Sequence, residues 1–364
     1  MKYLDEYRDR DATRVFLKQI RETVTRPWKI MEICGGQTHG LVKNGLLDLL
    51  PDEVQMIHGP GCPVCVTPKS LIDMAVQLME KGVVVCSFGD MVRVPGTTKS
   101  LLQAKAEGGD LRVLYSPIEA VTIARDNPEK EVVFFAVGFE TTAPADALSV
   151  LHAKKEGLTN YSILVSHVLV PPAMEAILAD EHAVIDAFLG AGHVCAIMGT
   201  TAYEPLARKY QIPIVVTGFE PLDLVDGIYR AVKQLEAGKY KVENQYSRVV
   251  RKEGNLEARK VIETVFEVAT REWRGIGPIP DSGYRLRDAF VDFDAELKFG
   301  VCSDTAENTS GCIAGEILKG LKKPHQCPYF AKECTPAKPL GAPMVSSEGA
   351  CAAYYHFSDH LIKT

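Results

Sequence analysis

The chain has 364 residues and a formal net charge of −6; 46% of its residues are hydrophobic and 24% are charged. These values suit a globular protein of about two or three domains, and they leave no basic footprint for nucleic acid or for a membrane surface. No apolar run approaches the about 18 residues of a membrane-spanning helix, and the charged N-terminus lacks the apolar core of a signal peptide. We therefore expect a cytoplasmic protein that binds neither nucleic acid nor membrane.

The chain contains ten cysteines. Structural disulfides are rare in the cytoplasm, so metal binding, redox chemistry or burial explains them better. One group lies in Gly-rich turns near the N-terminus, and another lies among prolines in the last fifth of the chain. This division predicts two kinds of thiol chemistry in one protein.

The first part of the chain alternates helical and strand patterns. Charged and apolar positions at helical spacing predict an amphipathic helix over residues 4–22. Short apolar strands are expected over 29–33, 54–57 and 83–86, with a helix over 68–81 that begins at a Thr-Pro cap. Each of these strands ends in a turn that contains Gly or Cys.

Similar strand patterns recur in the middle of the chain. Strands are expected over 132–137, 163–165, 194–198 and 214–216, and two of them end in Gly-Phe-Glu, which hints at an internal duplication. Short apolar strands that alternate with helices favour parallel α/β sheets. In such sheets ligands gather at the carboxyl ends of the strands.

The pattern loosens after about residue 241, where a helix over 256–270 precedes a segment rich in Pro and Gly. The expected fold is therefore α/β, with two similar parallel-sheet domains and a smaller, mainly helical and loop-rich C-terminal domain. The expected ranges are 28–118 for the first α/β domain and 119–238 for the second. Residues 1–27 and 239–364 are expected to form the third domain.

Four C-terminal cysteines lie at irregular intervals: Cys312, Cys327, Cys334 and Cys351. Structural zinc sites usually show short paired spacings such as C-x2-C, and none occurs here. A four-thiolate [4Fe–4S] cage tolerates such spacing, so iron–sulfur is favoured over zinc. Cys302 and His325 are further candidate ligands.

Two thiol sites are expected near the N-terminus. Cys62 and Cys65 form a C-x-x-C at a strand-to-helix turn, which favours a redox pair, with a metal half-site as the alternative. Cys34 stands alone before two glycines, with Thr38 and His39 on the next helical turn. A solitary thiolate beside a histidine suits a nucleophile or a single metal ligand, and a buried cysteine with a capping histidine is the alternative.

Other polar residues have simpler interpretations. Asp90 and Arg93 form a salt bridge or a helix cap, or belong to the site. Helix caps are the more favoured roles for Glu140 and Glu220. The remaining residues are interpreted as parts of the core: His167, His193, Cys86 and Cys195.

Five segments together resemble the signature motifs of the HypD family. They are Glu32-Ile-Cys-Gly-Gly-Gln-Thr-His39, His58-Gly-Pro-Gly-Cys-Pro-Val-Cys65, Cys86-Ser-Phe-Gly-Asp-Met-Val-Arg-Val-Pro95, Gly138-Phe-Glu-Thr-Thr142 and Ser346-Ser-Glu-Gly-Ala-Cys351. The resemblance runs from about residue 28 to the C-terminus. Gln37 stands where some members carry His, which leaves open a proton-handling role at that position.

The resemblance implies a role in [NiFe]-hydrogenase maturation. HypD proteins have two similar α/β domains and a third that holds a [4Fe–4S] cluster, here at Cys312, Cys327, Cys334 and Cys351. They act with the small chaperone HypC, receive cyanide from HypE, and serve the hydrogenase large subunit indirectly. The protein is then a redox-active scaffold for the Fe(CN)2CO unit, without independent small-molecule turnover and monomeric outside the complex.

The same resemblance implies roles for individual residues. Cys34 would bind the transient iron, with His39 and Asp90 shaping or protonating its site, while Cys62 and Cys65 would relay electrons from the cluster. Glu348 would lie between cluster and thiols, or would be an ordinary loop carboxylate. The alternatives from other classes are a stand-alone iron–sulfur thiol–disulfide oxidoreductase and a structural binding module that holds zinc.

Overall fold

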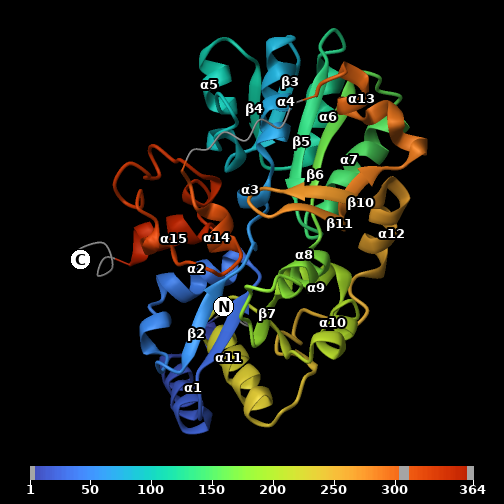
Figure 1. Cartoon of the computed structure of the whole chain (residues 1–364). Coiled ribbons are helices and arrows are strands. Elements are labelled where there is room, and N and C mark those ends of the chain that lie inside the picture. Colours follow the sequence, from blue (N-terminus) through green and yellow to red (C-terminus); the bar gives the residue numbers. More distant parts are fainter. Residues whose placement is uncertain (1–4, 303–310, 359–364) are drawn as a thin grey trace.

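The computed structural model describes residues 5–302 and 311–358 and contains two parallel sheets (Figure 1). The expected N-terminal helix is divided into a 3-10 turn, Asp5–Arg8, and helix α1, Arg10–Thr23. The division occurs at Asp9, whose carboxylate accepts hydrogen bonds from the backbone N–H groups of Asp11 and Ala12 and so caps α1. Leu4, the expected first residue of that helix, lies outside the described residues.

The first sheet has five parallel strands in the order β2-β1-β7-β8-β9. The strands are β1 (Trp28–Glu32), β2 (Val54–His58), β7 (Ala187–Ala191), β8 (Ile214–Thr217) and β9 (Val242–Asn244). Its helices are α2 (Gly35–Lys43), α9 (Gly192–Met198), α10 (Tyr203–Tyr210) and α11 (Pro221–Glu236), and α11 packs on α1.

The second sheet has four parallel strands in the order β4-β3-β5-β6. The strands are β3 (Val84–Phe88), β4 (Leu111–Leu114), β5 (Val132–Gly138) and β6 (Tyr161–His167). Helix α4 (Lys69–Glu80) leads into β3, and the helices that connect the four strands are α5 (Leu101–Ala106), α6 (Pro117–Asp126) and α7 (Ala143–Glu156). The residues of β5 and β6 are all buried, as expected for central strands covered on both faces.

The α/β fold with two parallel sheets is confirmed, but the sheets do not follow the ranges 28–118 and 119–238. The chain leaves the first sheet after β2, builds the whole second sheet, and returns through helix α8 (Val170–Leu178) to add β7, β8 and β9. Strand pairing across such distances depends on packing between the sheets, which no local pattern records. The described parts of 1–27 lie on the first sheet rather than with the C-terminal segment.

Three predicted elements were wrong in type or position. Residues 194–198 belong to helix α9, and the strand is Ala187–Ala191 just before it. The helix expected over 256–270 ends as α12 at Val265, because Phe266–Trp273 pairs as β10 with β11, Gly277–Leu286, in an antiparallel hairpin. The expected Thr-Pro cap instead closes a short helix, α3 (Pro63–Val66), and α4 begins afterwards at Lys69.

The C-terminal segment is rich in loops and lies beside α2 in Figure 1. Its helices are short, α14 (Ala314–Leu318) and α15 (Ala350–Phe357), with 3-10 turns at Pro324–Gln326 and Ala342–Met344. Helix α13 (Ala295–Phe299) lies instead against β6 of the second sheet (Figure 1). Helix α15 packs against α2, so the end of the chain lies on the helix that follows Cys34. Within residues 5–302 and 311–358, no helix is long and apolar enough to cross a membrane.

Candidate functional site

Cys34 lies between the end of β1 and the first turn of α2, and its side chain is only 1% exposed. The Gly-Pro-Gly turn after β2 packs directly on it. A Cβ built on Gly61 would lie 2.4 Å from the Cα of Cys34, and the Gly35 N–H donates to the Gly61 carbonyl at 2.8 Å. Only glycine permits this approach, which places the turn before Cys62 against Cys34.

His193, at the start of α9, is the side chain that faces the Cys34 sulfur. Its Nε2 lies 3.5 Å from Cys34 Sγ, and its ring stacks on Phe219 with centroids 5.2 Å apart. Burial lowers the pKa of His193 to about 4, so the imidazole is neutral near pH 7. Sequence reasoning placed His193 in the core, and the contact depends on chain segments 159 residues apart.

The Cys34 thiol is held in its neutral form. Burial raises its pKa above the ordinary value, and the nearby Glu348 carboxylate raises it further. A cation bound to the sulfur would reverse this balance, because a metal stabilises the thiolate. The neutral imidazole of His193 is then the adjacent group able to accept the proton.

Glu348, in the C-terminal segment, packs against the first turn of α2 at Gly35. A Cβ built on Gly35 would lie 2.6 Å from the Cβ of Glu348 and 2.4 Å from its carbonyl oxygen. Burial and then the charge of Asp90 raise the pKa of the Glu348 carboxyl. This carboxylate therefore belongs to the surroundings of Cys34.

His39 and Asp90 hold the segment that carries Glu348. The His39 Nδ1–H donates to the Ser347 carbonyl at 3.1 Å, and the Ser346 hydroxyl donates to Asp90 Oδ2 at 3.0 Å. Among the described residues, neither side chain makes a hydrogen bond to the Cys34 sulfur. Their observed role is to position this segment.

Cys62 and Cys65 are joined by a disulfide with their Cα atoms 5.2 Å apart. Cys62 caps α3, where its sulfur accepts from the Cys65 N–H at 3.2 Å, and both residues are buried. A sulfur at a helix N-terminus is stabilised as a thiolate when the bond is reduced. The pair thus lies in the turn that packs on Cys34.

The C-terminal cysteines meet around one cavity. It is lined by all four predicted ligands together with mostly apolar side chains: Cys312, Cys327, Cys334, Cys351, Ile313, Ile317, Phe330, Pro343 and Met344. Burial raises the pKa of the Cys351 thiol well above its ordinary value, and the other three cysteines are the next causes. A positively charged metal centre in this cavity would offset the negative charges that disfavour the Cys351 thiolate.

The cavity has further features that suit sulfur ligands. The Leu340 N–H donates to Cys334 Sγ at 3.4 Å, and a Cβ on Gly341 would lie 2.4 Å from Cys312 Sγ. Backbone N–H donors to cysteine sulfur are among the features that tune iron–sulfur sites. In the described parts of the chain, no group of three His, Cys, Asp or Glu side chains is placed to hold a single metal ion. A cluster separates its thiolates more widely than a single ion does, because each thiolate binds a different iron.

Among the described residues, several other candidates neither line the cavity nor bond to the Cys34 sulfur. Cys302 is exposed, and His325 stacks on Tyr354 rather than lining the cavity. Burial raises the pKa of Cys86 to about 12 and that of Cys195 to about 12, as expected for inert core thiols. Glu220 pairs with Arg8 at 2.6 Å.

A buried network ties the Cys34 strand to the C-terminal helix. Glu32 on β1 contacts His58 Nδ1 through its Oε1 at 2.6 Å, and His58 Nε2 lies 2.8 Å from the Tyr354 hydroxyl. The Thr38 hydroxyl donates to the same Glu32 oxygen. Strands β1 and β2, helix α2 and helix α15 are thus joined by side chains hidden from solvent.

The three thiol sites therefore converge. Glu348 lies at Cys34 and precedes Cys351 by three positions, so the Cα atoms of Glu348 and Cys351 are at most about 11 Å apart. The disulfide turn packs on Cys34 from another side through Gly61. One isolated thiol, one pair and one four-cysteine cavity share a single region of the molecule.

Comparison with known proteins identifies the family. Residues 11–358 match the family model described as "HypD: Hydrogenase formation hypA family". The chain belongs to the HypD family. It is 47% identical to the hydrogenase maturation factor HypD of Azotobacter vinelandii, over 98% of this chain and 97% of that protein.

Two further relatives are similar along their whole length. HypD of Escherichia coli is 45% identical, with 98% of both chains covered, and HypD2 of Bradyrhizobium diazoefficiens is 46% identical over 99% of this chain and 98% of that protein. The resemblance inferred from the five motifs is thereby confirmed.

Glu140, in one of those motifs, lies two residues after the end of β5 and is 2% exposed. Its Oε1 accepts from the Val170 N–H at 3.0 Å, while its Oε2 has no hydrogen-bond partner among the described residues. Burial raises the pKa of this carboxyl from 4.5 to about 7. Between about pH 4.5 and pH 7 this carboxyl is therefore protonated in the folded protein and ionised in the unfolded chain.

Glu140→Gln is therefore expected to change how stability depends on pH. In the parent, Glu140 lowers the free energy of unfolding progressively as pH rises from about 4.5 to 7. The reason is that the carboxyl ionises freely in the unfolded chain but only at a cost in its buried place in the folded protein. The variant should exceed the parent by about 1–3 kcal/mol in free energy of unfolding at about pH 8 and match it at about pH 4. Urea unfolding at both pH values measures this, and an equal difference at both would contradict it.

Proposed function

We propose that this HypD-family protein is the scaffold on which the Fe(CN)2CO unit of [NiFe] hydrogenase is assembled, with Cys34 as the ligand that this chain gives to the cargo iron. The observation that supports it most is the convergence of Cys34, the Cys62–Cys65 pair and the four-cysteine cavity. A HypC-type chaperone would give the other protein ligand, and a HypE-type protein would donate cyanide. The protein would work in the cytoplasm and be monomeric outside the complex.

Cys34 suits a cargo of low-spin iron. A soft thiolate is the matching ligand for iron that carries strong-field CN⁻ and CO groups. The thiol must lose its proton on binding, and His193 Nε2, 3.5 Å from the sulfur, is placed to take it. Glu348 adds a negative charge that favours an incoming cation over an anion.

The Cys62–Cys65 pair would store reducing equivalents beside the cargo. Reduction of its disulfide consumes two electrons and two protons and yields two thiols, and reoxidation returns both. A [4Fe–4S] cluster bound by Cys312, Cys327, Cys334 and Cys351 would supply these electrons one at a time from an external low-potential donor. The backbone around Cys334 and Gly341 would hold the sulfurs in place.

Infrared spectroscopy tests this proposal. The anaerobic protein, purified from a producing cell together with its HypC-type chaperone, should show CN⁻ and CO stretching bands. A stand-alone iron–sulfur thiol–disulfide oxidoreductase would show no such bands and would reduce protein disulfides without the chaperone. Absence of the bands together with such disulfide reduction would contradict the scaffold function and support the oxidoreductase.

A further inference from the structure

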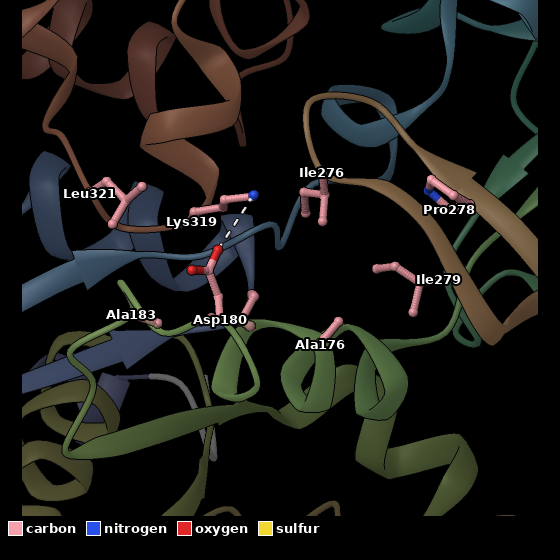
Figure 2. A pocket seen from close by; sticks show the side chains of 9 residues that line it. Ala176, Asp180, Ala183, Ile276, Pro278, Ile279, Lys319 and Leu321 are labelled. Carbon is pink, nitrogen blue, oxygen red and sulfur yellow. Dashed lines mark hydrogen bonds and ion pairs between the residues drawn. The ribbon is translucent and has the colours of Figure 1, made fainter.

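The turn of the β10–β11 hairpin reaches from the second sheet to the C-terminal segment. A Cβ on Gly275 would lie 2.8 Å from the Cα of Gly315 in α14, and a Cβ on Gly315 would lie 2.4 Å from the Gly275 carbonyl oxygen. Figure 2 shows Ile276 of this turn lining one pocket together with Ala176 of α8 and Lys319. The hairpin therefore touches the backbone three residues after Cys312.

Arg274, the first residue of that turn, is also fixed to the disulfide helix. Its backbone N–H donates to the carbonyl of Val66, the last residue of α3, at 2.7 Å. Its Nη2 donates to the Pro95 carbonyl at 3.2 Å. The backbone of Arg274 is thus fixed to the helix that carries Cys65, and one end of its guanidinium is fixed to Pro95.

The other end of the same guanidinium has no such anchor. Nη1 of Arg274 is buried and has no hydrogen-bond partner among residues 5–302 and 311–358. A buried donor without an acceptor is costly, so a nearby group that can accept from this atom is expected in the working protein. Arg274 is the one arginine in the hairpin turn, and it lies beside the segment of Cys312.

The charges around Arg274 indicate what it faces. Burial lowers the pKa of the guanidinium to about 10, which leaves it charged near pH 7, and Cys312 is the strongest of the negative groups that act on it, ahead of Asp73. Lys69 is the other cation near Cys312 and Asp73. Arg274 and Lys69 thus act on the same two negative groups, and Cys312 precedes Asp73 for both cations.

We propose that Arg274 is a positioning residue that joins the two redox centres: its backbone holds the disulfide helix while its free Nη1 donates to the anionic thiolate cage at Cys312. This inference rests on the proposed function, because it assumes a cluster in that cavity. A fixed positive charge stabilises the more negative, reduced form, so Arg274 raises the reduction potential of the cluster. It thereby sets how readily the centre beside Cys62 and Cys65 accepts an electron.

The test is a redox titration of the reconstituted full chain, followed by electron paramagnetic resonance. In Arg274→Gln the ratio of reduced to oxidised cluster, at the midpoint potential of the parent, should fall at least tenfold, a shift of about 59 mV to more negative potential. Arg274→Met, which has a side chain of similar length and no charge, should also shift the midpoint potential to a more negative value. Arg274→Lys keeps the charge but loses the planar guanidinium, so it should shift the midpoint potential less.

Lys319→Gln is the matched control. Lys319 also carries a positive charge in the C-terminal segment, but its Nζ pairs with Asp180 at 3.5 Å (Figure 2), and Lys319 does not line the four-cysteine cavity. The midpoint potential of the cluster in Lys319→Gln should equal that of the parent. A full cluster content with unchanged potentials in Arg274→Gln and Arg274→Met would overturn the inference alone, whereas a parent chain without bound iron and sulfide would overturn both it and the proposed cluster.

Discussion

Cys351→Ser is expected to lose the brown colour and at least nine-tenths of the cluster iron and sulfide of the anaerobically reconstituted protein. Cys351 lies in the first turn of helix α15 and lines the same cavity as Cys312, Cys327 and Cys334. A hydroxyl in its place is a hard, protonated donor, so one iron of the cluster would lack a strong protein ligand. Because metal binding and folding are coupled, the C-terminal segment should also become more sensitive to protease.

Cys302→Ser is the matched control for that loss. Cys302 is exposed and does not line the cavity, although its place in the sequence made it a candidate ligand. This variant should keep the full iron and sulfide content. Retention of the cluster in Cys351→Ser, combined with its loss in Cys302→Ser, would contradict the assignment of the cage.

The strands that carry the N-terminal thiols could be predicted because their signals are local. Strand β1 is a short apolar run that ends before Cys34, and β2 ends before the turn to Cys62, as the sequence indicates. Buried strands of a parallel sheet need only such runs and a terminating turn. The glycine-containing turn after β2 was visible in the sequence, whereas its contact with Cys34 through Gly61 was not.

The order of the strands could not be predicted in the same way. Strand β7 pairs with β1 although 154 residues lie between Glu32 and Ala187. The residues of β7, Ala-Phe-Leu-Gly-Ala, lack β-branched side chains, whereas Val194–Met198 resemble a strand and fold as part of helix α9. Burial between the sheets and their helices decides this competition, and local propensity does not record it.

The site shows the same limit. The four cysteines of the cavity were all predicted as ligands from the sequence. The same reasoning also left Cys302 and His325 as candidates, and neither lines the cavity. The contact of His193 with Cys34 was missed, since it depends on β7 lying beside β1. Arg274 belongs to none of the sequence motifs, so its role was not predicted. Only the path of the β10–β11 hairpin brings its backbone to Val66.

The second large effect is expected at Cys34. Cys34→Ser keeps a small polar side chain in a position that is 1% exposed, so the fold around α2 should persist. Serine offers the iron a hydroxyl, which is a hard, protonated donor and binds low-spin iron poorly. The cargo iron should therefore be lost, while the four-cysteine cavity, built from other side chains, should keep its cluster.

Cys86→Ala is the control for any general effect of removing a buried cysteine. Cys86 lies in β3 of the second sheet and is fully buried among core side chains. Its replacement creates a small cavity and lowers stability by about 1 kcal/mol, without touching Cys34. This variant should therefore carry its cargo as the parent does.

The most direct measurement is the infrared spectrum of the complex with the HypC-type chaperone, recorded for the parent, Cys86→Ala and Cys34→Ser at equal protein concentration. We expect CN⁻ and CO bands of equal strength in the first two proteins and a decrease of at least tenfold in Cys34→Ser, with its cluster iron and sulfide unchanged. Bands of full strength in Cys34→Ser would make Cys34 a packing residue and contradict the assembly of the iron unit at this thiol.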